Sequence, residues 1–483
     1  MRKLSLVVLA VFVLAAPAGA APKFGPNDPL FSRQWYVSQD RAFDTWSTLP
    51  VDLSPVRVAV IDSGIDVGHP EFEGRILEQK SFVGGTVADK QGHGTFVAGE
   101  IAAAVNNSQG IAGIAFPAEL LIAKVVEPDG TISPGVEARA IHWAVDEGAR
   151  VINLSIGGLR DPLNPERDTY SDQEMSAIEY ARSHDVVVVA AVGNGDQAPS
   201  TPWPYASYPA ALPHVLGVAA VSQDGSVPAF SNRDPIYVDM AAPGDGILST
   251  FPRSLTAQRP GCVDQGYSDC APPEYRDAQG TSFAAPQVSA AAALLLAVQP
   301  ELTSDQVTTL LEHSADDANP SNGCKHCSLL RDPLSGWGRL DITAALQDVE
   351  GTLPPADHFE ANDDAGKRAY TIYGRRHALR ATIDYWDDPV DVYRLYLLRG
   401  HRISASLRGL SDTNLDLVLW KPGTRTVAGL SATLQNRRAV YSAHAGPNER
   451  FSYKARKAGW YYVEVKIANP GYGPYTLRLT KTP

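Results

Sequence analysis

Three side chains of the types needed for nucleophilic hydrolysis lie in settings that suit that chemistry. Ser282 lies where a turn of small residues meets a long apolar stretch, 287–298, that predicts a helix. A nucleophile needs such a place, open above and surrounded by backbone N–H groups. Asp62 directly follows an apolar run, and His93 lies between two glycines where a second helix is predicted to begin. The order Asp, His, Ser is one of the known chain orders for a catalytic triad.

The chemistry explains why these residue types belong together. A serine hydroxyl is a weak nucleophile at neutral pH, so a neutral imidazole must accept its proton and a carboxylate must hold the imidazole in the right tautomer. The attacked carbonyl then becomes an oxyanion that needs fixed donors. Asn194, between two glycines after an apolar run, can offer a side-chain N–H, and Ser282 can offer its backbone N–H.

Each of these residues also has an ordinary structural interpretation. Asp62 could cap the end of a strand, His93 is one of 11 histidines, and Ser282 could be a helix N-cap. Their joint occurrence, each in the setting that its catalytic role requires, favours catalysis.

The elements that must position these side chains alternate between two patterns from residue 55 to about 348. Apolar, strand-like runs occur at 56–61, 120–126, 151–156, 186–192 and 215–221, and helical patterns at 95–105, 135–147 and 172–184. Continuous apolar strands separated by helices predict a parallel sheet covered on both faces. Chemistry in such sheets lies at the carboxyl ends of the strands. Asp62, Ser155 and Asn194 are therefore expected along one edge.

Four motifs together resemble the subtilisin-like serine proteases (subtilases, peptidase family S8). They are Asp62-Ser63-Gly64, Gly92-His93-Gly94-Thr95, Ala191-Val192-Gly193-Asn194, and Gly280-Thr281-Ser282 followed by Ala284 and Pro286. The resemblance covers about residues 27–348 and implies a three-layer α/β/α fold with a mainly parallel sheet. It also implies a serine endopeptidase that works through Asp62, His93 and Ser282, an acyl-enzyme intermediate and an oxyanion hole at Asn194, with no cofactor for the chemistry.

The same resemblance implies where a peptide substrate binds. One edge is formed by Ser155, Ile156 and Gly157, and the opposite wall of the pocket by Ala191, Val192 and Gly193. An extended peptide would pair with the first edge as an added strand. The small residues predict a broad apolar pocket. A cis proline is expected within 202–209, at Trp203-Pro204.

A structural calcium ion is a further implication of the resemblance. In this family the loop after the histidine helix binds calcium together with carboxylates from elsewhere. The matching residues are Asp28, Glu71, Val105, Asn107, Gln109 and Ile111. Oxygen ligands of these types suit calcium. Glu71 stands where Asp is commoner, and the alternative is an ordinary capped loop.

The remainder of the chain predicts a second domain. After a linker at 349–356 the apolar period changes to two, with strand candidates at 392–398, 402–407, 415–420, 460–467 and 475–479. This pattern predicts a β-sandwich over 357–483. Stretches such as 391–395 and 459–465 are similar to the pre-peptidase C-terminal domain of bacterial exported proteases. Asp363, Asp364, Asp387, Asp388 and Asp391 could bind calcium, but a solvated acidic loop is the favoured interpretation.

The N-terminus and the cysteines predict an exported protein. Residues 1–20 combine basic residues, a short apolar run and a small-residue cleavage site, which indicates a signal peptide ahead of a peptidase domain at 21–348. A retained anchor is the alternative, but the run is too short to span a bilayer. We expect a secreted protein, extracellular or periplasmic, with no membrane association after cleavage. Disulfides are expected at Cys262–Cys270 and Cys324–Cys327, with a redox or zinc site as the alternative for the second pair.

The length of the chain indicates the number of domains, and its net charge excludes one class of function. A chain of 483 residues is too long for one ordinary core and indicates two domains. A net charge of -12 argues against a general nucleic-acid binder. We expect a monomer that acts on protein or peptide substrates. The competing hypotheses are an inactive protease fold used as a binding module, and an esterase of the α/β-hydrolase type, whose residue order and Gly-x-Ser-x-Gly motif this chain lacks around Ser282.

Overall fold

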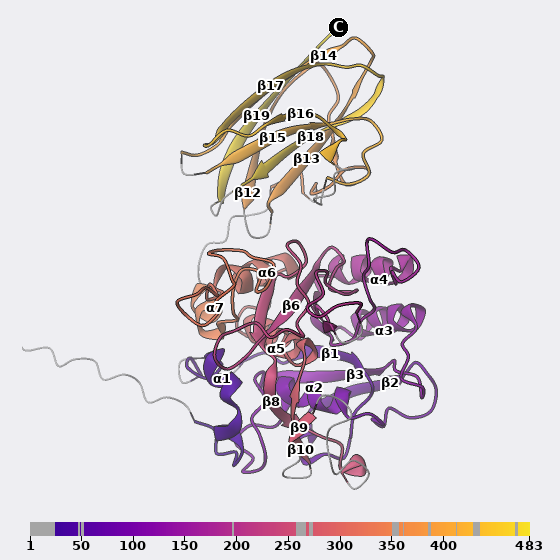
Figure 1. The fold of residues 1–483 in the computed structure, drawn as a ribbon, viewed down its shortest axis with the longest axis vertical. Helices are drawn as coiled ribbons and strands as arrows, with labels where there is room; N and C mark the ends of the chain where they lie inside the picture. Colours follow the sequence, from indigo (N-terminus) through magenta and orange to yellow (C-terminus); the bar gives the residue numbers. More distant parts are fainter. Residues whose placement is uncertain are drawn as a thin grey trace, which may run out of the picture.

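The chain forms two domains that lie end to end (Figure 1). The structure is a computed structural model that describes residues 25–46, 49, 53–195, 198–256, 267–269, 274–349, 357–360, 362–384, 388–411, 413–427, 435–468 and 472–483. The expected signal peptide, the Cys262–Cys270 pair and most of the expected linker lie outside these residues. The larger domain, 25–349, is α/β, and the smaller one, 357–483, consists of strands.

The α/β domain is built on a seven-stranded sheet in the order β2-β3-β1-β4-β5-β6-β7, and every neighbouring pair is parallel. The strands are β1 Val56–Asp62, β2 Ile76–Ser81, β3 Ala118–Lys124, β4 Val151–Leu154, β5 Val187–Ala191, β6 Val215–Val221 and β7 Met240–Pro243. The central strands are apolar and buried along almost their whole length because helices cover both faces. The expected three-layer fold is confirmed.

Helices cover the sheet as two separate layers with two hydrophobic cores. Helices α2 (His93–Ala102) and α5 (Ala285–Val298) pack on one face, and α3 (Pro134–Asp146) and α4 (Asp172–Arg182) on the other. Shorter helices are α1 Trp35–Gln39, α6 Ser304–His313 and α7 Ile342–Asp348. The stretch Thr281–Val298 is long and apolar enough to cross a membrane, but 89% of it is buried inside the protein, where it forms the central core helix.

The carboxyl ends of β1, β4 and β5 lie at one edge of this sheet, together with the turn that carries Ser282. β1 ends at Asp62, Ser155 follows β4, and Asn194 lies just after β5. A small sheet of order β8-β10-β9 (β8 Asp245–Thr250, β9 Tyr267–Asp269, β10 Tyr275–Gln279) leads the chain into a 3-10 turn, Thr281–Phe283, that carries Ser282. The expectation that the chemical residues share one edge is therefore met by the topology.

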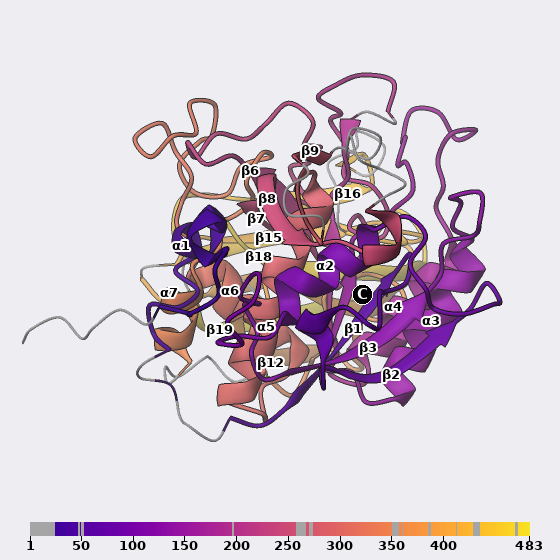
Figure 2. The ribbon, with the colours of Figure 1, turned by 90° about the horizontal axis from the view of Figure 1, so that it is seen from below.

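The second domain is a sandwich of two sheets around one main apolar core, and Figures 1 and 2 show the domain from two directions. The sheets are antiparallel except for the short parallel pair β11–β13. The first sheet has the order β11-β13-β18-β15-β16 and the second the order β12-β19-β14-β17. The strands are β11 Tyr370–Thr371, β12 Arg376–Asp384, β13 Val390–Leu397, β14 Arg402–Arg408, β15 Leu415–Trp420, β16 Arg438–Ser442, β17 Asn448–Lys454, β18 Gly459–Ile467 and β19 Tyr472–Thr482. The sandwich expected from the two-residue period is confirmed.

Local features test two further expectations. Cys324 and Cys327 form a disulfide, with their Cα atoms 5.3 Å apart, and both are buried. The expectation of a cis proline within 202–209 is confirmed, but the position expected for it, Trp203-Pro204, is wrong. The cis bonds are Thr201-Pro202 and Tyr208-Pro209, which flank the predicted position on both sides.

Candidate active site

His93 and Asp62 form a close pair at the end of β1 and the start of α2. Nδ1 of His93 lies 2.8 Å from Oδ1 and 2.9 Å from Oδ2 of Asp62. The Asp62 side chain is buried, whereas that of His93 is 24% exposed. A proton on Nδ1 is therefore directed at the carboxylate, and Nε2 is left as the acceptor on the open side of the ring.

The surroundings of His93 raise its pKa above the ordinary value of 6.5. Burial by itself lowers the pKa of His93, but the charge and hydrogen bond of Asp62 and the charge of Asp89 outweigh it. The imidazolium that forms when His93 accepts a proton is therefore stabilised by its carboxylate partners. This is the electrostatic arrangement that general-base catalysis requires.

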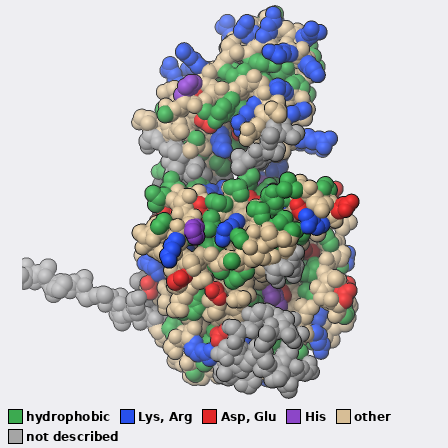
Figure 3. Space-filling view, in the orientation of Figure 1, with side chains coloured by type: hydrophobic (Ala, Val, Ile, Leu, Met, Phe, Trp, Pro, Cys, Tyr) green, Lys and Arg blue, Asp and Glu red, His purple; other side chains and the backbone are tan. Residues whose placement is uncertain are grey.

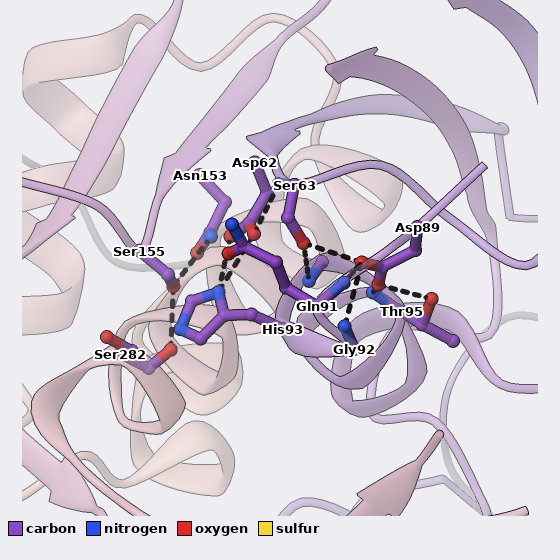
Figure 4. A network of polar contacts seen from close by, with 11 residues as sticks. Asp62, Ser63, Asp89, Gln91, Gly92, His93, Thr95, Asn153, Ser155 and Ser282 are labelled. Atoms are coloured by element: carbon purple, nitrogen blue, oxygen red, sulfur yellow. Dashed lines mark hydrogen bonds and ion pairs between the residues drawn. The ribbon is translucent and has the colours of Figure 1, made fainter. Parts of the chain in front are cut away.

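A buried carboxylate that the sequence did not single out, Asp89, orders the turn that carries His93 (Figure 4). Its Oδ1 accepts the N–H groups of Gln91 and Gly92 and the hydroxyl of Ser63, at 2.8–2.9 Å. Its Oδ2 accepts the backbone N–H and the hydroxyl of Thr95 at 2.9 and 2.7 Å. An Asp that binds N–H groups two and three residues ahead is a local turn pattern, so the spacing could have revealed it.

Ser282 lies beside the imidazole in Figure 4, on the turn that precedes α5. Its backbone carbonyl accepts a hydrogen bond of 2.6 Å from the hydroxyl of Ser155. Ser155 in turn accepts Nδ2 of Asn153, whose Oδ1 accepts the Ser289 hydroxyl of α5. No hydrogen bond joins the Ser282 hydroxyl to His93 among the described contacts. Such bonds often tighten only when substrate is present.

Asn194 is oriented as a donor by a neighbour of the nucleophile. Its Oδ1 accepts the backbone N–H of Thr281 at 3.0 Å and the Thr281 hydroxyl at 3.1 Å. The Thr281 hydroxyl also accepts the N–H of Gly193 at 3.1 Å. Because Oδ1 is occupied, the Nδ2 group is left to donate into the cleft. Sequence reasoning missed Thr281, since this contact joins residues 87 positions apart.

The three triad residues and Asn194 line one cleft of about 470 Å³. The expected substrate residues that line it are Ser155, Ile156, Gly157, Ala191 and Gly193. Val192 was expected there too, but it is fully buried in the core between α3, α4 and the sheet. The reason is the two-residue period of an extended chain, which turns Val192 away from the wall formed by its two neighbours.

Two glycines in the cleft are required by close backbone packing. A Cβ atom on Gly157 would lie 2.5 Å from the carbonyl oxygen of Tyr208. A Cβ atom on Gly193, whose φ is +93°, would lie 2.2 Å from the hydroxyl oxygen of Ser207. Ser207 lines the cleft as well, and no sequence motif indicated it.

A second extended edge, at Gly130–Ile132, faces the cleft opposite residues 155–157. Val126 and Ile132 form an antiparallel bridge that holds this edge as one side of a short hairpin. The cleft is therefore bounded by two extended segments, an arrangement that is suited to an extended peptide between them.

The loop expected to bind calcium is closed by hydrogen bonds around Glu71. This buried carboxylate accepts the N–H of Ile111 at 3.0 Å, the Tyr275 hydroxyl at 2.9 Å and Nδ2 of Asn107 at 2.8 Å. Burial raises the pKa of Glu71 to about 7. The interior of the loop is filled, since a Cβ on Gly110 would meet both Tyr275 and Glu71.

The other residues of that loop are satisfied in the same way. Asp28 accepts the N–H groups of Asn106 and Asn107 at 2.9 and 3.2 Å, and Oδ1 of Asn107 accepts the N–H of Gln109 at 2.8 Å. Val105 packs against the core. A cation here would face N–H and O–H donors where it needs oxygen ligands. The residues as arranged do not fit a calcium ion, and no part of the chemistry is assigned to one.

Comparison with known proteins points to one family. The family model described as Subtilase family (Peptidase_S8) matches residues 54–328. Thermitase from Thermoactinomyces vulgaris is 34% identical over 297 residues, which are 61% of this chain and 92% of thermitase. Subtilisin E from Bacillus subtilis (strain 168) is 36% identical over 265 residues, 54% of this chain and 61% of that protein.

Solved structures agree in fold. A protease structure from Pseudoalteromonas arctica PAMC 21717 matches with a TM-score of 0.54 and 27% identity, covering 67% of this chain and 99% of that one. The structure of a lanthipeptide protease matches with the same TM-score of 0.54 at 24% identity, covering 68% of this chain and 99% of that one.

Proposed function

Because the chain belongs to the subtilase family of serine proteases, we propose that it is an exported serine endopeptidase whose nucleophile is Ser282. The observation that carries this proposal is the cleft in which Ser282, the bonded pair His93–Asp62 and the donor Asn194 come together. The two extended segments beside the cleft favour an extended peptide chain as substrate, bound away from its ends.

The proposed chemistry uses the groups as they are placed. Ser282 Oγ attacks the peptide carbonyl carbon while its proton passes to Nε2 of His93, and the tetrahedral oxyanion accepts hydrogen bonds from Asn194 Nδ2 and the Ser282 N–H. His93 then gives the proton to the departing amine nitrogen, and the C–N bond breaks to leave an acyl-enzyme. Water attacks the ester, again with His93 as base, and releases the acid product and free serine.

Export is the second part of the proposal. The Cys324–Cys327 disulfide supports it, because such bonds persist mainly in oxidising compartments. The signal-like pattern of residues 1–20 and the secreted character of the family agree with it. N-terminal sequencing of the protein recovered from culture medium tests this part, and a mature protein found only inside the cell would contradict it.

The activity is tested by incubating the purified protein with casein beside a Ser282→Ala variant. We expect hydrolysis by the wild type and a loss of at least about 10³-fold in the variant, because the nucleophile is absent. Ser176→Ala, which changes a serine on the surface of α4, is the matched control and should keep full activity. Equal and negligible hydrolysis by the wild type and the Ser282→Ala variant would instead favour the hypothesis of an inactive fold used for binding.

A further inference from the structure

A group of acidic side chains gathers at one place in the sandwich domain, remote from the catalytic cleft. Carboxylate oxygens of Asp357, Glu360 and Asp391 lie within 4.8 Å of one another, and so do those of Glu360, Asp363 and Asp388. Glu360 belongs to both of these groups of three carboxylates, so the five side chains form one acidic cluster. This differs from the solvated loop that the sequence favoured, because Asp391 is fully buried and the other four are only partly exposed. Asp364 lies outside the cluster, and Asp387 outside the described residues.

The acidic cluster lies where the domain's first segment crosses both sheets. Asp357 accepts the N–H of Thr382 in β12 at 2.7 Å, which ties the segment to one sheet. The Asn362 carbonyl accepts the N–H of Val392 in β13 at 2.7 Å, which ties it to the other. A ligand held by Asp357, Glu360 and Asp391 would therefore join the entry segment to the body of the sandwich.

A buried amide beside the acidic cluster is independent evidence of a missing partner. The Asn362 side chain is fully buried with its Nδ2 group beside Asp391, and its Oδ1 accepts no hydrogen bond from any described residue. Oε1 of Glu360 and Oδ1 of Asp391 likewise lack hydrogen-bond donors in the described part of the chain. Buried polar atoms without partners are rare and need an explanation such as a bound ion.

Protein cations do too little to balance this charge. Arg182 of α4 reaches Asp363, with Nη2 3.7 Å from Oδ2, but Arg182 also bonds Asp305 at 3.2 Å. On the face seen in Figure 3, the Lys and Arg side chains of the sandwich gather at its outer end, away from the α/β domain. Such a concentration of carboxylates is stabilised when a divalent cation lies among them.

The ligand types indicate which cation fits. The acidic cluster offers carboxylate oxygens, with an amide and the Tyr475 hydroxyl, which donates to Asp391 at 2.6 Å. It contains neither the imidazole nor the thiolate ligands that zinc and copper prefer. Several carboxylates in an irregular arrangement suit calcium, which takes six to eight oxygens, better than magnesium, which demands a near-ideal octahedron. In the Glu71 loop both oxygens of Glu71 and of Asp28 accept N–H or O–H donors. In the acidic cluster both oxygens of Asp357 also accept N–H groups, but Oε1 of Glu360 and Oδ1 of Asp391 accept no donor among the described residues.

We propose that Asp357, Glu360, Asp363, Asp388 and Asp391, with Asn362, form a calcium site that fastens the entry segment of the sandwich domain. Occupancy would also fix Asp363 where it faces Arg182, and so would support the contact between the domains. Nearby contacts of the same junction are the ion pair of Arg368 with Glu179 and the hydrogen bond of 3.0 Å between Arg368 Nη1 and His214 Nε2.

Calcium titration of the full-length Ser282→Ala protein, which cannot digest itself, tests this site. After chelation and removal of the chelator, we expect calorimetry with CaCl2 to show saturable binding with a Kd of about 10⁻³ M or tighter, typical of extracellular modules. Terbium should bind in place of calcium and emit on excitation of tyrosine, because Tyr475 bonds a ligand residue. Calcium should also raise the midpoint of thermal unfolding.

Four variants decide where the ion binds. Asp391→Asn and Glu360→Gln should each weaken binding at least tenfold, and both should lose the thermal shift while remaining folded by circular dichroism. Asp364→Asn, an acidic neighbour outside the acidic cluster, should bind as the parent does. Absence of binding by the parent, or unchanged binding in both Asp391→Asn and Glu360→Gln, would overturn the proposal. Loss of binding in Glu71→Gln, with binding kept in the two cluster variants, would move the site to the other domain and overturn it as well.

Discussion

At the scale of single residues, the state of the His93 imidazole depends on Asp62. The carboxylate raises the pKa of a ring that burial alone would lower, and it fixes the tautomer by accepting from Nδ1. Proteolysis requires the neutral ring, so activity should be lost as the pH falls through a pKa that lies above 6.5. Asp62→Asn should move this acid limb of kcat/KM to lower pH and reduce kcat about 10⁴-fold.

The pH profile of peptide hydrolysis measures both effects. Asp66→Asn is the matched control, because Asp66 is close in sequence but bonds Arg253 and not His93. An acid limb that stays at the same pH in Asp62→Asn would show that Asp62 does not set the pKa of His93.

Asn194 is the second residue whose role can be isolated. Asn194→Ala removes a donor to the oxyanion, which develops only in the transition state, so kcat should fall about 10²–10³-fold while KM changes little. Steady-state kinetics on a peptide amide substrate gives both constants, with Asn164→Ala on the surface as the control. A rise in KM at unchanged kcat would mean that Asn194 binds substrate without stabilising the oxyanion.

The residues of the site could be predicted from sequence where their signals are local. Asp62, His93, Asn194 and Ser282 each sit in a short motif, and their order along the chain is informative. The residues that hold them could not be found in this way when the contact is distant, as with Thr281 and Asn194, 87 positions apart. Val192 was misplaced because the motif that contains it was taken as one wall, although alternate residues of an extended chain face opposite sides.

At the scale of elements, helices α3 and α4, which cover the same face of the sheet, each contribute one carboxyl group to a buried pair. Glu137 lies in the first turn of α3 and Glu174 in the first turn of α4, and both are buried. Burial raises the pKa of Glu174 to about 7, and burial together with the charge of Glu174 raises that of Glu137 well above its ordinary value. At neutral pH the pair therefore holds a proton that joins the two helices.

This pair predicts a decline of stability with rising pH. For carboxyl groups whose folded pKa is raised, the stabilising proton is fully present below about pH 4.3 and is lost as the pH rises through about 7. Glu137→Gln supplies a permanent amide donor, so it should flatten the decline of the thermal midpoint between about pH 4.3 and about pH 7. Thermal unfolding in the Ser282→Ala background measures this, with exposed Glu166→Gln as control. Equal slopes in all three proteins would contradict the shared proton.

Strands could be predicted from the sequence where both of their faces are buried. Strands β1 and β6 are buried on both faces, so their apolar runs mark them almost to the residue. Strand β2 was missed because it lies at the sheet edge and exposes most of its polar side chains. Strand β12 was missed for a related reason, since its sequence alternates basic and apolar residues over a partly exposed surface. Edge elements carry a weaker apolar signal than central ones.

At the scale of the whole molecule, the catalytic cleft and the sandwich domain lie at different places on the α/β domain. The cleft opens at the carboxyl ends of β1, β4 and β5. The sandwich lies against the α/β domain at α4 and His214, and a further pocket is lined by Trp337 of the α/β domain and Pro389 of the sandwich (Figure 1). The sandwich therefore leaves the cleft free, and the two-domain plan that chain length and the change of period indicated is consistent with a catalytic unit and an attached second unit.

The central claim is that Ser282 is a nucleophile activated by His93, and a fluorophosphonate probe tests it most directly. Such a probe reacts with an activated serine, so intact mass and peptide mapping should show one adduct per chain, on Ser282, formed in step with the loss of casein hydrolysis. His93→Ala should react far more slowly, and Ser282→Ala should remain unlabelled. An unlabelled wild type that still cleaves casein, or an adduct on a different serine that accounts for the loss of activity, would contradict the account.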